Sequence, residues 1–468
     1  MNTTPSTFAC VAVLCCASAA SAQVDPVRAA ATIGMIGDVA QTIGEQCVTV
    51  TTLMGPGIDP HLFRPTARDI QTLAAADLIL YAGLGLEGQL GDVLEQIGSR
   101  TPALSVGETA IAPDELIATD DLYGVDPHVW MDPRLWSRVV EAVREVFPGA
   151  LLQWEDFRKD NASRLLDTYR DRLPSFNDDI QGTGAVCLAG VLTAVAGSGG
   201  ELAAQRAVVL GAGAAGLGIA RQLKEAIEGA GGEPHCVAVL DSRGLLVGDH
   251  FRDAYKAEMA WPVTVAAARG LGAEAGADLE AVVRAFKPTI LVGVSGQAGA
   301  FSERVVREMA THAARPIIMP LSNPTDYAEA RPEEILRWTE GRALVATGSP
   351  FADVVLEGRR HTIGQGNNVF IFPGLGLGAL LAQARSVSEG MIGAAARTLA
   401  EVARQESFGE SRLYPRVSRL RHTTRLVAAA VMRAACAEGQ CPPLDEAAIQ
   451  SRLAAAHWEP DYPPYEPG

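Results

Sequence analysis

The chain has 468 residues, a length that allows about two to four domains. Hydrophobic residues make up 48% of it and charged residues 20%, and no apolar run after the first 25 positions is long enough to cross a membrane. The composition predicts a folded protein that is not transmembrane after removal of a leader, and the net charge of −16 argues against nucleic acid or an anionic membrane as a partner.

An apolar stretch opens the sequence and runs from Phe8 to Ala20. It ends in Ala20-Ser21-Ala22, a small-x-small site that a signal peptidase could cut. Residues 1–22 therefore predict a signal peptide and export to the periplasm. Residues 1–7 contain no Lys or Arg, which leaders usually carry.

Residues 23–147 alternate short β-rich runs with helical stretches, a pattern that predicts a small α/β lobe with a parallel sheet. Apolar residues at helical spacing predict one amphipathic helix over Leu135–Phe147, and we expect two unrelated parts of the chain to join there. The expected strands of the lobe are Ala31–Ile36, Val48–Leu53, Asp77–Tyr81 and Ala103–Val106.

Two histidine motifs stand in this lobe: Gly55-Pro-Gly-Ile-Asp-Pro-His61-Leu-Phe-Arg-Pro and Asp126-Pro-His128-Val-Trp-Met-Asp-Pro. Over about residues 30–140 the sequence resembles periplasmic zinc/manganese-binding proteins of ABC importers. The resemblance implies that His61 and His128 are metal ligands, as neutral imidazoles. That family completes its site from a second lobe whose motif we do not find here, so we expect at best a weak, open site for Zn²⁺ or Mn²⁺.

Four carboxylates follow between residues 148 and 182: Glu155, Asp156, Asp178 and Asp179. Oxygen ligands of this kind suit Mg²⁺ or Mn²⁺. Taken alone, acidic residues more often form a solvated face. The sequence around them decides between the two interpretations.

Residues 183–468 predict a doubly wound nucleotide-binding domain, because strands alternate with helices. The expected strands are Ala207–Leu210, Cys236–Leu240, Thr289–Val294, Pro316–Leu321 and Ala343–Thr347. The fold class is therefore α/β, with a C-terminal Rossmann-type domain preceded by the small lobe.

A Gly-x-Gly-x-x-Gly sequence follows the first of these strands and opens a helix, which is the context that dinucleotide binding requires. Gly211 permits the turn, Gly213 lets the pyrophosphate approach the backbone, and Gly216 lets the helix pack on the sheet. Asp241 ends the next strand, where an acid binds the ribose. A carboxylate there favours NAD and would repel the 2′-phosphate of NADP. Arg243 nearby keeps NADP as an alternative.

The metal segment and the later motifs resemble malic enzymes over about residues 138–468. The motifs are Leu152-Gln-Trp-Glu155-Asp156-Phe157, Pro174-Ser-Phe-Asn-Asp178-Asp179-Ile-Gln-Gly-Thr183, Leu240-Asp241-Ser-Arg-Gly-Leu-Leu-Val247, Gly293-Val-Ser-Gly296, Leu321-Ser-Asn323-Pro-Thr325, Thr347-Gly-Ser-Pro-Phe351 and Gly364-Gln-Gly-Asn-Asn368-Val-Phe-Ile-Phe-Pro373.

The resemblance implies a role for each of these positions. Glu155, Asp156 and Asp179 would ligate Mg²⁺ or Mn²⁺, with Asp178 beside them as the catalytic carboxylate. Asn323 and Asn368 would contact malate, and Ser295, Gly296 and Asn323 would contact the cofactor. The implied reaction is hydride transfer from C2 of malate to NAD(P), followed by loss of CO₂ to give pyruvate.

Malic enzymes also use a tyrosine and a lysine for proton transfer, both from the region before the metal segment. No lysine precedes Lys159 in this chain, and Tyr81 and Tyr123 stand in no such motif. Loss of a general acid or base commonly costs roughly 10²- to 10⁴-fold in rate. We therefore expect cofactor binding with impaired turnover.

Three functions stay open at this point. The chain is an NAD-dependent malic enzyme, a periplasmic metal-binding protein with an incomplete site, or an inactive NAD-binding hybrid. The leader directs the chain outward, whereas malic enzymes are typically cytoplasmic. The sequence does not decide whether the two parts are a genuine gene fusion or a mis-joined reading frame. It also does not decide whether the chain forms a homo-oligomer.

Cysteines add little, because Cys47, Cys187, Cys236, Cys436 and Cys441 are scattered without metal-ligand spacing. We expect them to be mostly buried thiols.

Overall fold

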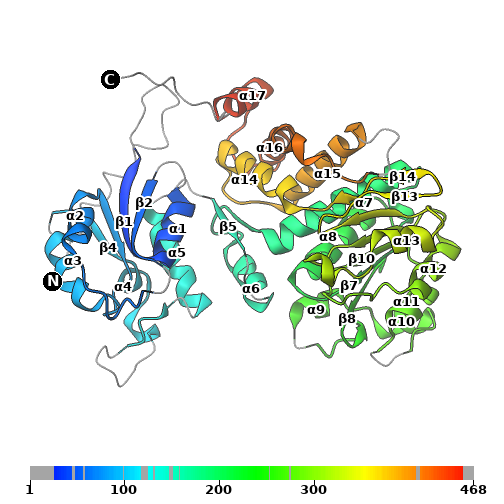
Figure 1. Cartoon of the computed structure of the whole chain (residues 1–468), viewed down its shortest axis with the longest axis horizontal. Helices are drawn as coiled ribbons and strands as arrows, with labels where there is room; N and C mark the ends of the chain where they lie inside the picture. Colours follow the sequence, from blue (N-terminus) through cyan, green and yellow to red (C-terminus); the bar gives the residue numbers. More distant parts are fainter. Residues whose placement is uncertain are drawn as a thin grey trace. The chain divides into compact units, whose positions relative to one another are not determined.

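The computed structural model describes residues 26–44, 48–55, 58–98, 100–116, 125–129, 132–146, 151–155, 157, 159–251, 253–272, 276–406 and 412–456. Its contacts divide the chain into unit 1, Met1–Leu152, and unit 2, Gln153–Gly468 (Figure 1). The predicted leader, Tyr123 and Asp156 lie outside the described residues.

Unit 1 contains a parallel sheet in the order β2-β1-β3-β4, with helices packed against it (Figure 1). Its small strands and helices confirm the predicted α/β lobe. The elements are β1 (Val27–Ile33), α1 (Gly34–Gly44), β2 (Val48–Met54), α2 (Ala67–Ala75), β3 (Leu78–Tyr81), α3 (Gly91–Gly98), β4 (Ala103–Ser105), α4 (Val106–Ala110) and α5 (Pro133–Val146).

The first strand is the one that the sequence places wrongly. We expected Ala31–Ile36, but β1 begins at Val27, and helix α1 already starts at Gly34. The strand lies between β2 and β3, and its alanines are buried. Alanine has a low strand propensity, so the pattern gave no strand signal before residue 31. The predicted helix over Leu135–Phe147 is α5, which begins two residues earlier.

Unit 2 is built on a sheet in the order β15-β12-β11-β10-β7-β8-β9. All neighbouring strands are parallel except β8 and β9. This arrangement confirms the doubly wound domain, and the five predicted strands coincide with β7, β8, β10, β11 and β12 to within two residues. The strands are β7 (Ala207–Leu210), β8 (Val237–Asp241), β9 (Gly244–Leu245), β10 (Ile290–Gly293), β11 (Ile317–Pro320), β12 (Leu344–Thr347) and β15 (Gly364–Gln365).

Two small sheets complete the strands of unit 2. β5 (Leu152–Trp154), whose first residue is the last of unit 1, pairs with β6 (Ser175–Asn177). β13 (Val354–Leu356) pairs with β14 (Arg359–His361). β6 leads directly into Asp178 and Asp179, two of the four carboxylates singled out in the sequence.

Helices cover both faces of the large sheet (Figure 1). Apolar residues of α11, α12 and α13 pack in one core with alternate residues of the strands, among them Val208, Leu291 and Ile318. α7 and α8 pack against each other, and α8 contacts β7 and β8. The helices are α6 (Lys159–Tyr169), α7 (Thr183–Ser198), α8 (Ala214–Gly229), α9 (Ala254–Met259), α10 (Val263–Ala268), α11 (Leu279–Phe286), α12 (Glu303–His312), α13 (Pro332–Trp338), α14 (Phe372–Ala382), α15 (Glu389–Glu406), α16 (Leu420–Ala437) and α17 (Glu446–Ala455).

One helical stretch of the described residues, Asp178–Ser198, is long and apolar enough to cross a membrane by length and composition. An 18-residue window of that stretch is 78% buried inside the protein. It packs against α8 and α15. Its apolar surface is therefore used within unit 2.

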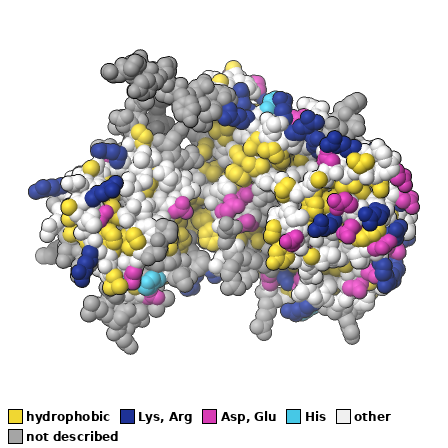
Figure 2. All heavy atoms as spheres, in the orientation of Figure 1, with side chains coloured by type: hydrophobic (Ala, Val, Ile, Leu, Met, Phe, Trp, Pro, Cys, Tyr) yellow, Lys and Arg dark blue, Asp and Glu magenta, His cyan; other side chains and the backbone are white. Residues whose placement is uncertain are grey.

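Charged side chains of unit 2 lie interspersed on the face shown in Figure 2, where blue and magenta alternate along the right-hand side. Several of them pair on the surface. Glu280 contacts both Arg284 and Arg304, each at 2.6 Å. Exposed pairs of this kind add little stability.

Candidate functional site

The order of strands in unit 2 reverses at β7, which has β8 on one side and β10 on the other. In such sheets, ligands bind outside the carboxyl ends of the strands at this point. Gly211 follows β7 there with φ +123°, and a Cβ on it would lie 2.6 Å from the carbonyl oxygen of Val294, just after β10. Only glycine fits this turn.

The other two glycines of the fingerprint have different surroundings. A Cβ on Gly216 would lie 1.7 Å from the oxygen of Gly211, so a side chain would push α8 off the sheet. A Cβ on Gly213 would meet nothing within 4 Å. Gly213 is the N-cap of α8, and no side chain caps the helix, so none accepts a hydrogen bond from its first N–H groups. Such a helix end attracts phosphate.

Asp241 ends β8 and is already paired. Its Oδ2 accepts a hydrogen bond from Lys256 Nζ at 2.5 Å, and its Oδ1 accepts one from the backbone N–H of Arg243 at 2.8 Å. Burial raises the pKa of Asp241, but these bonds outweigh it and hold the pKa below its ordinary value. Asp241, the predicted ligand of the ribose, is therefore already paired with the ammonium group of Lys256.

A buried acid, Glu329, ties two loops at the carboxyl edge together. Its side chain is fully buried, and Oε1 accepts hydrogen bonds from the N–H of Ser295 at 2.8 Å, the hydroxyl of Ser295 at 2.8 Å and the hydroxyl of Ser322 at 2.6 Å. Ser322 Oγ in turn accepts the N–H of Gly296 at 2.8 Å. The loops after β10 and β11 are thus fixed to one carboxylate.

Asn323 follows Ser322 and is exposed. Its Oδ1 accepts a hydrogen bond from Ser349 Oγ at 2.7 Å, from the loop after β12. A Cβ on Gly348 would lie 2.1 Å from the oxygen of Leu321, so these loops pass close together. Three successive loops therefore carry polar groups at one edge of the sheet.

The segment that carries the predicted metal ligands ends in a wide turn. Residues Asp178–Gly182 are a π-helix, η6, which precedes α7. Asn177 Oδ1 accepts the N–H of Ile180 at 2.9 Å, and Gln181 Oε1 accepts the N–H of Asn177 at 3.0 Å. Short π-helical turns occur often at functional sites.

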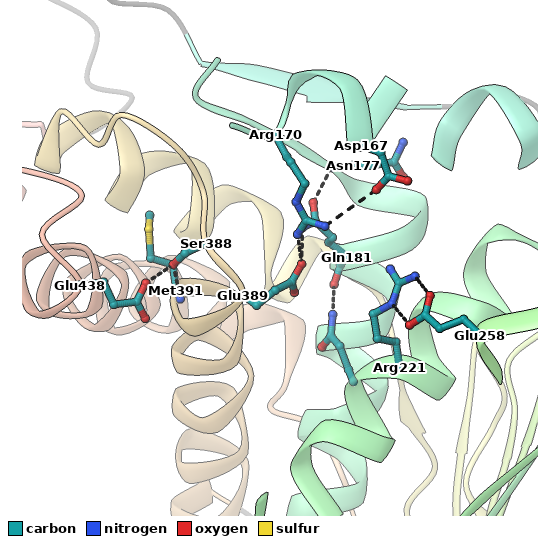
Figure 3. Close-up of polar contacts among 11 residues, drawn as sticks. Asp167, Arg170, Asn177, Gln181, Arg221, Glu258, Ser388, Glu389, Met391 and Glu438 are labelled. Atoms are coloured by element: carbon teal, nitrogen blue, oxygen red, sulfur yellow. Dashed lines mark hydrogen bonds and ion pairs between the residues drawn. The ribbon is translucent and has the colours of Figure 1, made fainter. Parts of the chain in front are cut away.

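Two contacts hold this turn from outside (Figure 3). Arg170 and Gln181 Nε2, the latter at 3.1 Å, both donate to Oε1 of Glu389, the first residue of α15. Gln222 Nε2 on α8 donates to the carbonyl oxygen of Gln181 at 2.9 Å. The turn is therefore fixed between α15 and α8.

Asp178 meets Asn368 at the centre of the site. Asn368 Nδ2 donates to Asp178 Oδ2 at 2.9 Å and to Thr183 Oγ1 at 2.9 Å. Asp178 is buried, and its Oδ1 has no hydrogen-bond partner among the described residues. The pKa of Asp178 is raised to about 7, mainly by burial. The hydrogen bond from Asn368 opposes this rise, and the nearby charges of Glu155 and Asp179 add to it.

These carboxylates have the donor chemistry of a site for Mg²⁺ or Mn²⁺. An unpartnered buried oxygen beside two further carboxylates suits a hard cation, which would offset their repulsion. In the part of the chain that the structure describes, no group of three or more His, Cys, Asp or Glu side chains is arranged to hold a metal ion. Asp156, the fourth carboxylate, lies outside that part.

In unit 1, the two histidines that the sequence predicts to be metal ligands lie close together. His61 Nε2 and His128 Nε2 lie 3.2 Å apart, with the rings edge to face. His128 Nδ1 lies 2.6 Å from Asp126 Oδ1, and the backbone N–H of His128, then its ring, lower the pKa of Asp126. Two imidazoles on one tetrahedral Zn²⁺ place their nitrogens about 3.3 Å apart.

Two residues at the edge of the large sheet escaped the sequence analysis. Lys256 could have been noticed, because it is one of only four lysines in the chain and lies 15 residues after Asp241. Glu329 stands between two alanines with no motif around it, and only its burial reveals it.

Comparisons with known families match both units. The family described as malic enzyme, NAD binding domain, matches residues 180–436, more than half of the chain. The family described as zinc-uptake complex component A periplasmic matches residues 30–186.

Curated relatives match about 70% of the chain. The chain is 45% identical to NAD-dependent malic enzyme 3 of Bacillus subtilis over 334 residues, which cover 69% of this chain and 58% of that protein. It is 42% identical to the NAD-dependent malic enzyme of Pectobacterium carotovorum over 333 residues, which cover 70% and 59%. The chain therefore spans less than two thirds of the length of these relatives.

Solved structures share the fold. The malic enzyme of Entamoeba histolytica superposes with a TM-score of 0.56 at 21% identity, covering 92% of this chain and 75% of that one. The NAD-dependent malic enzyme of Thermotoga maritima superposes with a TM-score of 0.51 at 22% identity, covering 79% and 91%. The family match over residues 180–436 shows that the chain belongs to the malic enzyme family through its NAD-binding domain.

Proposed function

We propose that unit 2 binds NAD and a divalent cation and acts on malate by oxidative decarboxylation to pyruvate. The observation that carries this proposal is the contact between Asp178 and Asn368, 190 positions apart in the chain. It joins the carboxylate segment to the last motif of the nucleotide domain.

The cofactor would lie outside the carboxyl end of β7, where the order of the strands reverses. Gly211, Gly213 and Gly216 would receive the pyrophosphate at the start of α8, and Asp241 the adenosine ribose. The nicotinamide half would lie over the loops of Ser295, Gly296 and Asn323, which Glu329 and Ser349 hold. NADP is the alternative that Lys256 favours.

Glu155, Asp156 and Asp179 would hold Mg²⁺ or Mn²⁺, with Asp178 beside them. The cation supplies Lewis-acid polarisation of the 2-oxygen of malate. Asn323 would bind a substrate carboxylate through its amide N–H group, because among the described residues only its Oδ1 is used in a hydrogen bond. Asn368 donates both hydrogens of Nδ2 to Asp178 and Thr183, so it would contact malate through its amide oxygen. The buried Asp178 would hold Asn368 in place for this role.

We infer that proton transfer limits turnover in this chain. The chain has no lysine before Lys159, and residues 30–186 match a different family from the one that matches unit 2. We therefore propose impaired turnover, roughly 10²- to 10⁴-fold below that of a complete malic enzyme. In this arrangement, residues 23–147 are a metal-binding lobe, 148–182 the metal-ligand segment and 183–468 the NAD-binding domain.

The test measures NAD⁺ binding by calorimetry and NADH formation with malate and Mn²⁺. We expect NAD⁺ binding and slow, Mn²⁺-dependent NADH formation, which Asp178→Asn abolishes. Asp171→Asn removes an exposed carboxylate from the same segment and should leave both unchanged. A chain that binds no NAD⁺ would overturn the proposal, and a rate equal to that of a complete malic enzyme would overturn the impairment.

A second function is favoured by the two histidines of unit 1. Their Nε2 atoms face each other at a distance that fits a shared Zn²⁺ or Mn²⁺, and Asp126 orients His128 as an outer carboxylate does in metal sites. We propose a weak metal site there. This function and the predicted leader together support our proposal that the chain is exported to the periplasm.

Competition with a chromogenic chelator measures Zn²⁺ binding to this site. His61→Ala should lose the ion that the unaltered chain binds. His422→Ala removes an exposed histidine on α16 and is the matched control. Equal binding by both variants would exclude the site.

A further inference from the structure

Two thiols meet at the end of α16. Cys436 is in its last turn and Cys441 follows five residues later, with the sulfur atoms 3.0 Å apart. Backbone bonds close the turn between them, from Gly439 N–H to the oxygen of Cys436 at 3.1 Å and from Gln440 N–H to the oxygen of Ala435 at 2.8 Å. The backbone therefore already holds the two sulfurs close together.

The two thiols differ in access. Cys441 is buried, and burial first, then its contact with Cys436, raises the pKa of its thiol to about 11. Cys436 is only half-buried, so a reagent reaches it first. Cys187 and Cys236 are buried elsewhere, in α7 and before β8. Among the cysteines that the structure describes, the pair at the end of α16 is thus the reactive candidate.

We propose that Cys436 and Cys441 form a disulfide by exchange with a small-molecule disulfide. The thiolate of Cys436 attacks one sulfur of the reagent, forms a mixed disulfide and releases one thiolate. The thiolate of Cys441 then attacks the sulfur of Cys436 and releases the second. The protein loses two protons and two electrons, and the S–S bond of the reagent is reduced to two thiols. The protein sulfurs have to approach by only about 1 Å.

This disulfide would lock the loop that holds the start of α15. Gln440 accepts the N–H of Arg385 at 3.0 Å through its carbonyl oxygen and the hydroxyl of Ser386 at 2.9 Å through Oε1. Glu438 accepts the hydroxyl of Ser388 (Figure 3). The next residue, Glu389, accepts hydrogen bonds from Arg170 and Gln181, which both lie in the proposed metal-ligand segment, residues 148–182. The crosslink therefore fixes a segment that touches the proposed active site.

The test exposes the full-length protein to oxidised glutathione or to dithiothreitol, followed by proteolysis and mass analysis. We expect one peptide that contains both cysteines and is about 2 Da lighter after oxidation. Cys436→Ser should abolish this loss, and Cys236→Ser, a matched control, should keep it. A glutathione adduct that stays on Cys436, or two thiols left free, would overturn the proposal.

Hydrogen exchange of the unaltered protein tests the consequence without any variant. Oxidation should slow exchange in residues 385–392 and 438–441, and should raise the unfolding midpoint by several degrees. Equal exchange in both redox states would overturn the locking of this loop. Neither experiment needs NAD or malate, so a failure here is distinct from a failure of the proposed function.

Discussion

Replacement of Lys256 by glutamine should change the choice between NAD and NADP. In the structure, Lys256 neutralises Asp241 across 2.5 Å, and their side chains are 22% and 13% exposed. A 2′-phosphate would find both an attractive ammonium and a repulsive carboxylate there, whereas a 2′-hydroxyl needs only the carboxylate as acceptor. Without the lysine, Asp241 keeps its charge and its hydrogen bond from Arg243.

The expected size follows from the contact that is lost. A hydrogen bond between charged groups contributes about 1.5–3 kcal/mol. At about 1.4 kcal/mol per factor of ten, Lys256→Gln should weaken NADP relative to NAD by about 10- to 150-fold. Asp241→Asn should move the ratio in the opposite direction, because it leaves the ammonium unopposed.

Calorimetric titration of each variant with both dinucleotides measures this ratio. Lys287→Gln is the matched control, because Lys287 is exposed at the end of α11, before β10 and thus at the opposite edge of the sheet. A ratio that moves by the same factor in Lys256→Gln and Lys287→Gln would refute the reasoning. A ratio unchanged in both Lys256→Gln and Asp241→Asn would show that the dinucleotide ribose lies elsewhere.

Three further changes test other parts of unit 2. Glu329→Ala leaves the N–H and hydroxyl of Ser295 without their buried acceptor, and urea unfolding should show a loss of about 2–5 kcal/mol, with a weaker NAD⁺ affinity by calorimetry. Gly216→Ala puts a methyl group 1.7 Å from the oxygen of Gly211, so calorimetry should show at least about tenfold weaker NAD⁺ binding in a protein that keeps its circular dichroism spectrum. Burial, then a neighbouring arginine, lowers the pKa of His361, so the unfolded chain binds its proton more tightly. The contribution of His361 to the free energy of unfolding should therefore be complete above about pH 6.5 and be lost as the pH drops through the lowered pKa. The loss should amount to at most about 1.4 kcal/mol per pH unit in urea titrations, and His361→Gln should remove this slope.

The sequence predicted the strands of unit 2 well for a physical reason. Parallel strands with helices on both faces are continuous apolar runs, such as Ala207–Leu210 and Ile290–Gly293, and these need no alternating pattern to be recognised. The same criterion failed for β1, because its buried residues Ala29–Ala31 are alanines, which have a low strand propensity. Small residues report close packing, which a sequence alone does not locate.

The candidate site was predictable where one short segment carries it. The glycine turn is such a segment, since Gly211 and Gly216 meet each other within six residues. Glu329 was not predictable, because its partner Ser295 lies 34 positions away and only the folded sheet brings them together. Lys256 was missed for the same reason, at a separation of 15. Local motifs such as the glycine turn predict which kind of ligand binds. Contacts between residues distant in sequence, such as Lys256 with Asp241, set the charge around the predicted site.

The pair of Asp178 and Asn368 has a consequence for synthesis and turnover of the protein. Asp178 precedes the first strand of the large sheet, and Asn368 follows the last one. Contacts so distant in sequence form late, because loop closure must come before them. A nascent or clipped chain that stops before residue 368 would carry the whole glycine turn and yet leave a buried carboxylate without its amide. The pair can therefore form only after every strand of the large sheet has been synthesised, because Asn368 follows the last of them.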